Sequence, residues 1–529
     1  MNMKKILYTI TLTLATILTG TSCSDFLSAY SQTMIVAKTV YDLDEVLLGG
    51  VYIKSKAMSE GPTIHRTAGF LNILDDDVNT GSIGDETSKT WGTCLSSIYG
   101  IYAWQLRIGS NFDASYFRND NATWNDLYNR INVINILLDE ITQLPHETDD
   151  ELSAYIRIHG EAYFLRAQFY FMLANLYGDA YTPATCNTKL CVPLKLTPYV
   201  EHDKNKDTQF HRATLKEVYA QIIADLLQAK ECLTRSPQAD HHRLHRASME
   251  SVGLLLSRVY LYMQEWEKAE KEADEVMRST AATLSSIQAF TSDKAFLTED
   301  NPEILFSQGH NSLVTDLVFM ARPGDFCVTK ELYDMYDEND CRRDCFFGKL
   351  LATGDSIIMK NKYEKGSMVS HISDVFTLRM AEAYLNKAEA CAIQGKAEEA
   401  NQTLNALRKQ RIEGYTPQSY TGEELVTQIR DERRKELCFE GHRWFDLRRY
   451  AVCESYPYSK EIIHVYHVCG NKGVSHTQIF RLEKNDKAYT FALPESVIQF
   501  DNVPMEDNPR DSREPLKADT EEETETPEQ

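Results

Sequence analysis

The stretch Ile429–Tyr450 constrains the fold most strongly, because it mixes many charges with large aromatic side chains. It reads IRDERRKELCFEGHRWFDLRRY. If each residue turns by about 100° along an α-helix, five apolar residues share one arc of about 120°. They are Leu425, Ile429, Leu437, Trp444 and Leu447. An arc of that width is typical of a helix that packs against a core, so we predict a buried helix here.

Charged residues of both signs fall on the same arc. Arg433, Glu436 and Glu440 lie inside it, and Arg443 lies at its edge. Stranding a buried charge without a partner costs several kcal/mol, so charges on a core-facing stripe must be paired. Their spacings put neighbouring side chains within reach of one another on a helix. Charge runs are usually solvated, but Trp444 among these charges favours burial. We predict an ion-paired structural helix and not an active site.

Length and net charge exclude some classes of protein. At 529 residues the chain can bury a sizeable core and form two to four domain-sized units. It carries 56 basic and 78 acidic residues, a net charge of −22. Such a charge disfavours non-specific binding to nucleic acid, so we expect no nucleic-acid partner.

The N-terminus has the pattern of an export signal. Lys4 and Lys5 precede the apolar and hydroxyl-rich run Ile6–Thr19, which is too short to span a bilayer. Cys23 ends the segment LTGTSC, which resembles a bacterial lipoprotein box except that Gly20 stands where Leu is usual. We expect residues 1–22 to be a signal peptide and Cys23 to be lipidated, which would anchor the protein to membrane lipid. The alternative is an ordinary secretory signal with a coincidental cysteine.

Helical periodicity covers much of the chain. Trp124–Thr142 has apolar residues at spacings of three and four, and Leu152–Tyr177 is apolar nearly all round. The segments Met263–Ala269 and Gln394–Ala400 match each other at turns between two helices. Each resembles a tetratricopeptide unit, which buries its apolar face by stacking on a neighbour. We predict a mostly α fold built on a tetratricopeptide-like helical repeat scaffold.

An aromatic cluster follows a polar loop that contains Asp76 and Asp77. Its members are Trp91, Tyr99, Tyr102 and Trp104. Exposed aromatic rings pack against the C–H faces of a pyranose, while nearby carboxylates bind its hydroxyl groups. We therefore expect these six residues to bind a ligand. The alternative is that the aromatic side chains belong to the core.

The chain loses helical periodicity over 281–370, where short runs suggest strands and loops. Inserted loops on a rigid scaffold often carry binding specificity, so this small-β insertion is a candidate ligand face. It separates a helical and aromatic portion, 23–280, from a C-terminal helical portion, 371–505, in which Tyr466–Phe491 suggests a hairpin. Residues 506–529 are polar and acidic, and we expect them to be disordered.

Residues with catalytic or metal-binding spacing are not evident. The close pairs Cys186/Cys191 and Cys341/Cys345 match no common zinc pattern, although a disulfide within either pair stays open for an exported protein. Three consecutive aspartates from Asp75 do not provide the separated carboxylates that a glycosidase needs. There is no nucleophile elbow or phosphate-binding loop. We expect no cofactor, no metal and no enzymatic activity.

Four motifs resemble the SusD/RagB family of outer-membrane lipoproteins, of the Bacteroidetes type. They are Gly160–Asp179, Ser257–Trp266, Leu378–Ala390 and Glu432–Arg449. The resemblance implies a helical scaffold with a loop-rich ligand face. It also implies a surface-exposed, lipid-anchored protein of the cell outer membrane that passes a nutrient to a TonB-dependent, SusC-like porin.

Two functions fit this resemblance, and two others belong to different classes. The favoured function is capture of oligosaccharides at the cell surface, and the alternative is RagB-like capture of peptides or glycoproteins. A surface hydrolase and a scaffold that only assembles partners are the other hypotheses. Retention of glycans would favour the first function, and retention of peptides would favour the second. Turnover of a glycan would indicate a hydrolase, and tight ligand-free association with a porin would indicate a scaffold.

The charged stretch generates a first prediction. Arg433→Met or Glu440→Leu should lower the free energy of unfolding by about 3–5 kcal/mol, because each leaves a buried partner unpaired. Chemical denaturation measures the change. A variant that unfolds like the parent and loses only ligand binding would show that the stretch is a binding site.

Overall fold

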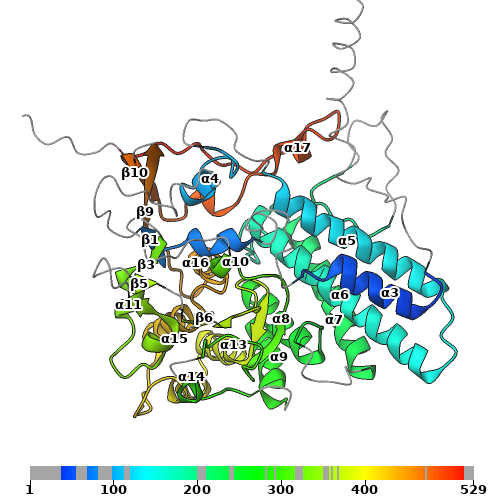
Figure 1. Cartoon of the computed structure of the whole chain (residues 1–529), viewed down its shortest axis with the longest axis horizontal. Helices are drawn as coiled ribbons and strands as arrows, with labels where there is room; N and C mark the ends of the chain where they lie inside the picture. The colour runs from blue at the N-terminus through cyan, green and yellow to red at the C-terminus, as the bar shows by residue number, and fades with distance from the viewer. Residues whose placement is uncertain are drawn as a thin grey trace, which may run out of the picture.

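Figure 1 shows the computed structural model, which describes residues 37–54, 68–80, 98–111, 120–198, 210–236, 244–279, 283–290, 294–315, 326–349, 357–358, 361–365, 368–470 and 473–516. Helices are the predominant elements and the strands are short, which confirms the predicted mostly α fold class. The predicted signal peptide, Cys23 and Trp91 lie outside the described residues. Within the described part of the chain, no helix is long and apolar enough to cross a membrane.

Helices form the first part of the fold. They are the seven-residue α3 (Val40–Val46) and the longer α5 (Ala122–Glu140), α6 (Asp149–Tyr177) and α7 (Leu215–Arg235). Helix α6 begins at a capping box, in which Thr148 and Glu151 each accept a hydrogen bond from the other's backbone amide. From Phe164 onward every residue of α6 is buried, because α5 and α7 pack against it (Figure 1). Its apolar sequence predicted this burial.

Two helix pairs repeat one another. They are α8 (Met249–Tyr262) with α9 (Trp266–Arg278), and α13 (Met380–Ile393) with α14 (Ala397–Lys409). In their turns Met263 and Gln394 have φ/ψ of −79°/−5° and −76°/−1°. The next residues, Gln264 and Gly395, have left-handed φ values of 63° and 77°. The two turns share one backbone conformation, which confirms the predicted repeat.

The charged stretch forms two helices joined by a tight corner. They are α15 (Gly422–Leu437) and α16 (Arg443–Ala451), so the prediction of one helix over Ile429–Tyr450 is wrong. Phe439 and Gly441 adopt left-handed φ values of 57° and 73°, which end α15. A Cβ on Gly441 would lie 3.3 Å from the Cα of Val375, so the corner packs directly on that backbone.

Short strands pair the insertion with the portions of the chain before and after it. One sheet has the order β1-β3-β5-β4 and comprises β1 (Val78–Thr80), β3 (Phe326–Val328), β5 (Ile357–Ile358) and β4 (Gly348–Lys349). A second sheet pairs β2 (Ile304–Ser307) with β8 (Thr377–Arg379). Residues 281–370 therefore contact the N-terminal portion through β1 and the C-terminal portion through β8.

An antiparallel hairpin of β9 (Ile462–Gly470) and β10 (Gly473–Leu482) confirms the hairpin predicted near Tyr466. The remaining elements are η1 (Leu47–Val51), η2 (Gly69–Ile73), α4 (Tyr99–Tyr102), η4 (Ile141–Gln143), η5 (Ile287–Ala289), α10 (Ser312–Thr315), α11 (Lys330–Asp334), α12 (Arg342–Phe346), β6 (Glu364–Lys365), β7 (Met368–Val369), η6 (Lys487–Tyr489) and α17 (Glu495–Ile498).

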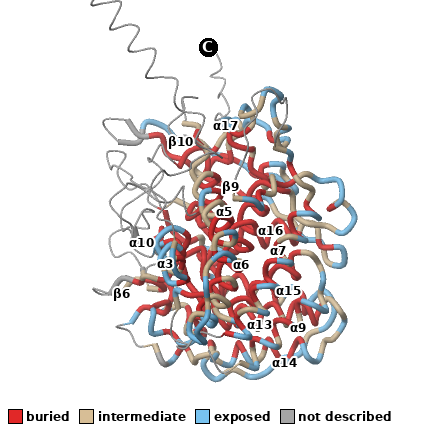
Figure 2. The backbone as a smooth tube through the Cα atoms, turned by 90° about the vertical axis from the view of Figure 1, so that its right-hand side faces the viewer, coloured by how far each residue is buried: buried red, intermediate tan, exposed pale blue. Residues whose placement is uncertain are grey.

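One hydrophobic cluster joins both helical portions. It extends from Val40 in α3 to Val497 in α17, and Figure 2 shows buried residues throughout the middle of the molecule. Residues 506–516 also pack on this body, since Leu493 N–H donates to Asp507 at 2.7 Å and Asn508 donates to Tyr177 O at 2.7 Å. The prediction of disorder from residue 506 is therefore wrong for these residues.

The repeat turn generates a second prediction. Gly395→Ala should lower the free energy of unfolding by about 1 kcal/mol, because Ala resists a left-handed φ. No atom lies within 4 Å of the added Cβ, so backbone strain is the whole effect. Gly49→Ala is the control, since its Cβ also meets nothing within 4 Å and its φ is not left-handed. Equal losses in the two variants, measured by chemical denaturation, would contradict this explanation.

Candidate functional site

The predicted ligand-binding aromatics that the structure describes lie in the core. Tyr99, Tyr102 and Trp104 are 6%, 0% and 0% exposed. The ring of His464 from β9 lies between Tyr102 and Trp104, with centroid distances of 4.2 and 4.1 Å. The ring of Tyr99 lies 4.9 Å from that of Tyr466 on the same strand. The prediction that these three side chains are exposed is wrong, because the hairpin covers them.

The imidazole of His464 joins this aromatic layer to the acidic loop. Its Nδ1 lies 2.9 Å from Tyr102 O, and its Nε2 lies 2.9 Å from Asp75 O. Burial lowers the pKa of His464 to about 4, so the ring is neutral near pH 7 and donates to one of the two carbonyls. The layer is a packed, hydrogen-bonded part of the core.

The two predicted ligand-binding carboxylates are also occupied. The carboxylate of Asp76 accepts hydrogen bonds from Nε and Nη2 of Arg443, at 2.8 and 2.9 Å, and from Nζ of Lys460 at 2.7 Å. Asp77 receives Nε of Arg434 at 2.7 Å. Burial opposes ionisation of Asp76, but Arg443 and Arg434 outweigh it and hold its pKa well below the usual range. The prediction that these carboxylates are free to bind hydroxyl groups is wrong, because α15 and α16 supply their partners.

Glu436 is the centre of a second buried charge cluster. Its carboxylate accepts from Arg379 at 2.7 Å, and from Arg342 and Arg411 at 2.9 Å each. Glu436 and these three arginines are at most 1% exposed. Burial opposes ionisation of Glu436, but Arg411, Arg379 and Arg342 hold its pKa well below the usual range. Glu303 adds a second carboxylate to Arg379 and Arg411.

The other predicted structural residues are also buried, but their partners come from distant segments. Glu440 forms ion pairs with Arg379 at 2.7 Å and with Lys362 at 2.6 Å. Arg433 pairs with Asp446 at 2.9 Å across the corner. Trp444 is 1% exposed. The expected burial and pairing are therefore present, whereas the pairing between neighbours on one helix face was the wrong arrangement.

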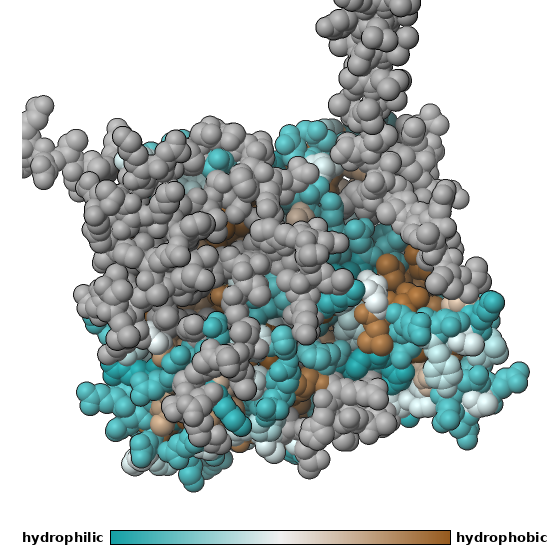
Figure 3. All heavy atoms as spheres, in the orientation of Figure 1, coloured by the Kyte–Doolittle hydropathy of each residue, from teal (hydrophilic) through white to brown (hydrophobic). Residues whose placement is uncertain are grey.

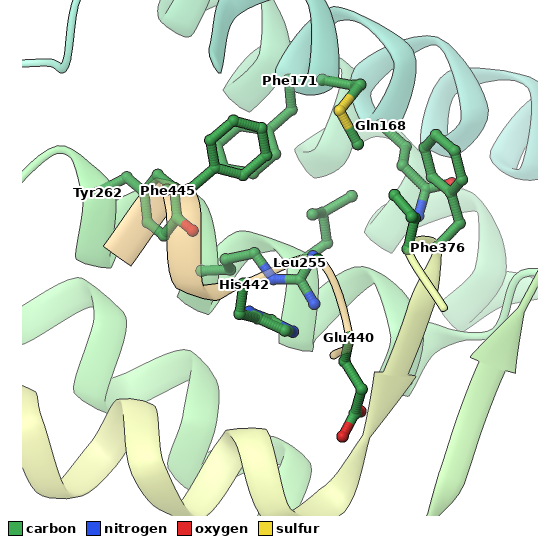
Figure 4. A pocket seen from close by; sticks show the side chains of 12 residues that line it. Gln168, Phe171, Leu255, Tyr262, Phe376, Glu440, His442 and Phe445 are labelled. Atoms are coloured by element: carbon green, nitrogen blue, oxygen red, sulfur yellow. The ribbon is translucent and has the colours of Figure 1, made fainter. Parts of the chain in front are cut away.

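A small cavity lies between the corner and α6 (Figure 4). Its lining includes Gln168 and Phe171 from α6, and Glu440, His442 and Phe445 from the corner. Its volume of about 20 Å³ has room for one water molecule and not for a sugar. Burial and nearby arginines, first among them Arg258, hold the pKa of His442 well below its usual value, so the ring is neutral.

A larger pocket opens between α15, α16 and the loop that follows α16. Its volume is about 200 Å³. Arg430 and Asp431 line it from α15, and Tyr450, Tyr456 and Tyr458 line it from α16 and the loop. It brings aromatic rings and charges of both signs to one opening, and it lies outside the predicted ligand face.

The paired cysteines carry no crosslink. Cys186, Cys191, Cys341 and Cys345 are free thiols, so the disulfide alternative is wrong for both pairs.

Two repeated helix pairs, an insertion paired to the scaffold through short strands, and a buried charge network characterise this molecule. Together they define a helical-repeat protein with an inserted region of loops and short strands.

Comparisons with known proteins identify the family to which this architecture belongs. The model of the SusD family matches residues 352–509, and a model described as "Starch-binding associating with outer membrane" matches residues 70–261. SusD-like protein P38 of Formosa agariphila is 23% identical over 62% of this chain and 71% of its own length. The starch-binding protein SusD of Bacteroides thetaiotaomicron is 36% identical over 110 residues, 20% of this chain and 19% of its own.

Solved structures share the fold. A SusD superfamily protein from Bacteroides thetaiotaomicron has a TM-score of 0.64 at 19% identity, covering 89% of this chain and 100% of that one. A laminarin-binding SusD-like protein has a TM-score of 0.58 at 20% identity, covering 89% and 97%. Both family models describe SusD-type proteins, so the comparisons support a SusD-type protein, as the four motifs predicted.

Buried Glu389 generates a third prediction, about acid stability. It is 0% exposed and receives both Nη atoms of Arg449 at 2.7 Å. Burial opposes its ionisation, but Arg449 outweighs burial and lowers its pKa to about 2. A lowered pKa stabilises the fold above the unfolded-state pKa of about 4.3 and loses that contribution as the pH falls towards 2.

The free energy of unfolding should therefore fall between about pH 4.5 and pH 2, and Glu389→Gln should flatten that slope. The variant should also be less stable at pH 7 by about 1.5–3 kcal/mol, because Arg449 loses its charged hydrogen bonds to Glu389 and keeps Asp446, at 2.7 Å, as its carboxylate partner. Glu399→Gln, on an exposed position of α14, is the control and should keep the parent's slope. Denaturant titrations at several pH values measure both effects. Identical slopes in parent and Glu389→Gln would contradict the lowered pKa of Glu389.

Proposed function

We propose that the protein is a glycan-binding lipoprotein of the cell surface, which captures oligosaccharides and delivers them to a TonB-dependent, SusC-like transporter. The observation that carries the proposal is the match of residues 70–261 to a family described as starch-binding and associating with the outer membrane. The fold shared with a laminarin-binding protein supports the same ligand class. Figure 3 shows that hydrophilic residues predominate among the coloured atoms of the face drawn there, which suits a polar ligand.

A lipid on Cys23 would hold the folded body close to the outer membrane. The described chain begins at Ala37, and 37 − 23 gives 14 residue steps between the two positions. Fully extended, a segment of this length spans at most about 50 Å. The capture surface would therefore stay near a transporter in the same membrane, which shortens the path of the ligand after capture.

Trp91 and the 281–370 insertion are the proposed ligand-binding parts. The sheet through β1 and β3 tethers the insertion to the segment that precedes Trp91 in the chain. A tryptophan ring offers a flat apolar face for a pyranose, and loops on a rigid scaffold supply hydroxyl contacts. Because Tyr99, Tyr102 and Trp104 are buried, Trp91 is the one member of the predicted aromatic set kept in this role.

Glycan capture generates the fourth prediction. The mature protein should be retarded in native gels that contain laminarin or starch, and Trp91→Ala should weaken this retention about tenfold, equivalent to about 1.4 kcal/mol. Tyr41→Ala, which removes an aromatic ring that is 47% exposed on α3, is the control and should migrate like the parent. Purification of the lipidated protein from outer membranes should recover a TonB-dependent transporter.

Other results would favour the competing functions. Retention by peptides and by no glycan would replace sugar capture with peptide capture. Release of shorter sugars from the polysaccharide by the purified chain would make the protein a hydrolase. Tight association with the transporter without retention by any ligand would leave an assembly role.

A further inference from the structure

The pocket between α15 and α16 combines the features of a small polar binding site. Glu423, Thr427 and Asp431 line it from successive turns on one face of α15, and Arg430 lies beside Asp431. Tyr450 comes from α16, and Tyr456 and Tyr458 come from the loop behind that helix. Its volume of about 200 Å³ is below the ~300–1,000 Å³ that is common for drug-sized ligands. It suits a ligand of one ring.

Asp431 brings an uncommitted carboxylate to this pocket. Its neighbours Arg434 and Arg443 are bound to Asp77 and Asp76, at 2.7 and 2.8 Å. The carboxylate of Asp431 makes no hydrogen bond or ion pair with the described part of the chain. It is half-buried, and burial raises its pKa, because the surrounding arginines compensate only in part. A carboxylate in this position gains from a ligand that donates hydrogen bonds.

Arg430 brings uncommitted donors to the same pocket. Its Nη1 donates to Tyr456 O at 2.8 Å, and its guanidinium lies 4.2 Å from the centre of the Tyr450 ring. The side chain is more than nine-tenths buried, yet its Nη2 has no hydrogen-bond partner among the described residues. A buried donor without an acceptor is unfavourable, so an acceptor atom that reached Nη2 would stabilise this side chain.

Aromatic faces complete the pocket. Tyr458 is 46% exposed, and Tyr456 is half-buried beside it. Such rings offer apolar surface next to polar groups, which favours a ligand that is apolar on its face and polar at its edge. The ring of Tyr450 is already covered by Arg430, so Tyr456 and Tyr458 are the available stacking partners.

We propose that this pocket is a monosaccharide-sized subsite, in which Asp431 accepts from sugar hydroxyl groups, Arg430 donates to them, and Tyr456 and Tyr458 pack on the ring. A hydroxyl group both donates and accepts, so a neutral sugar suits the unpaired carboxylate of Asp431 and the unpaired Nη2 of Arg430 together. A simple cation would be repelled by Arg430, and a simple anion by Asp431. This inference rests on the proposed function for its ligand class, but it assigns a site remote from Trp91 in the sequence.

The test uses the mature protein with glucose, galactose and mannose as separate probes, and glycine as a zwitterionic probe, in saturation-transfer NMR titrations. At least one hexose should bind saturably. Asp431→Asn and Tyr458→Ala should each weaken that binding at least tenfold. Glu424→Gln, on an exposed α15 position that does not line the pocket, and Tyr41→Ala are the matched controls and should bind like the parent. Thermal melting of every variant establishes that the fold is retained, and Tyr458→Ala alone decides the matter if Asp431→Asn is unfolded.

Three outcomes would overturn the subsite: no hexose binds, hexose binding is equal in parent and pocket variants, or glycine binds and displaces the hexose. These outcomes are separable from failure of the proposed function. Retention in laminarin or starch gels that depends on Trp91 would survive the loss of the subsite. Loss of that retention in the parent would refute glycan capture and leave the hexose titrations as an independent result.

Discussion

The carboxylate of Glu436, buried beneath three guanidinium groups, holds the insertion, strand β8 and the segment after the last repeat together. Arg342 comes from α12, Arg379 from the end of β8, and Arg411 from the segment after α14. An isolated carboxylate at this depth would be strongly unfavourable, so the position of α15 requires all three arginines. In return, Arg411 depends on α15, because Glu303 is its other carboxylate partner and Glu303 also pairs with Arg379.

A second set of ion pairs extends the same constraint to the N-terminal portion. Arg434 binds Asp77 and Arg443 binds Asp76. Both aspartates immediately precede β1 in the chain. The hairpin then closes over Tyr102 and Trp104 through His464. Residues that could have stacked on a sugar thus become part of the core. The ligand-binding parts that we propose are therefore the insertion, Trp91 and the outer pocket of α15.

Local periodicity accounts for what the sequence could predict. The apolar spacing of α5, the apolar sequence of α6 and the matching turns of α9 and α14 are visible within short windows. The burial of Tyr102 was not visible, because its cover lies at His464, about 360 residues later in the chain. Arg342 and Arg411 carried no periodic signal, since Arg342 begins the five-residue helix α12 and Arg411 lies in the segment after α14. Gly441 was a signal for the corner, but a helical wheel drawn through it assumes that the helix continues.

A double-mutant cycle between Glu436 and Arg411 tests most directly whether the buried charges are structural. Glu436→Gln, Arg411→Met and the double variant are compared by denaturant unfolding and by retention in laminarin or starch gels. We predict that each single change lowers the free energy of unfolding by about 3–5 kcal/mol. The coupling energy should be about 0.5–3 kcal/mol, with glycan retention unchanged wherever the fold persists. Single variants that unfold like the parent but lose glycan retention would contradict the account.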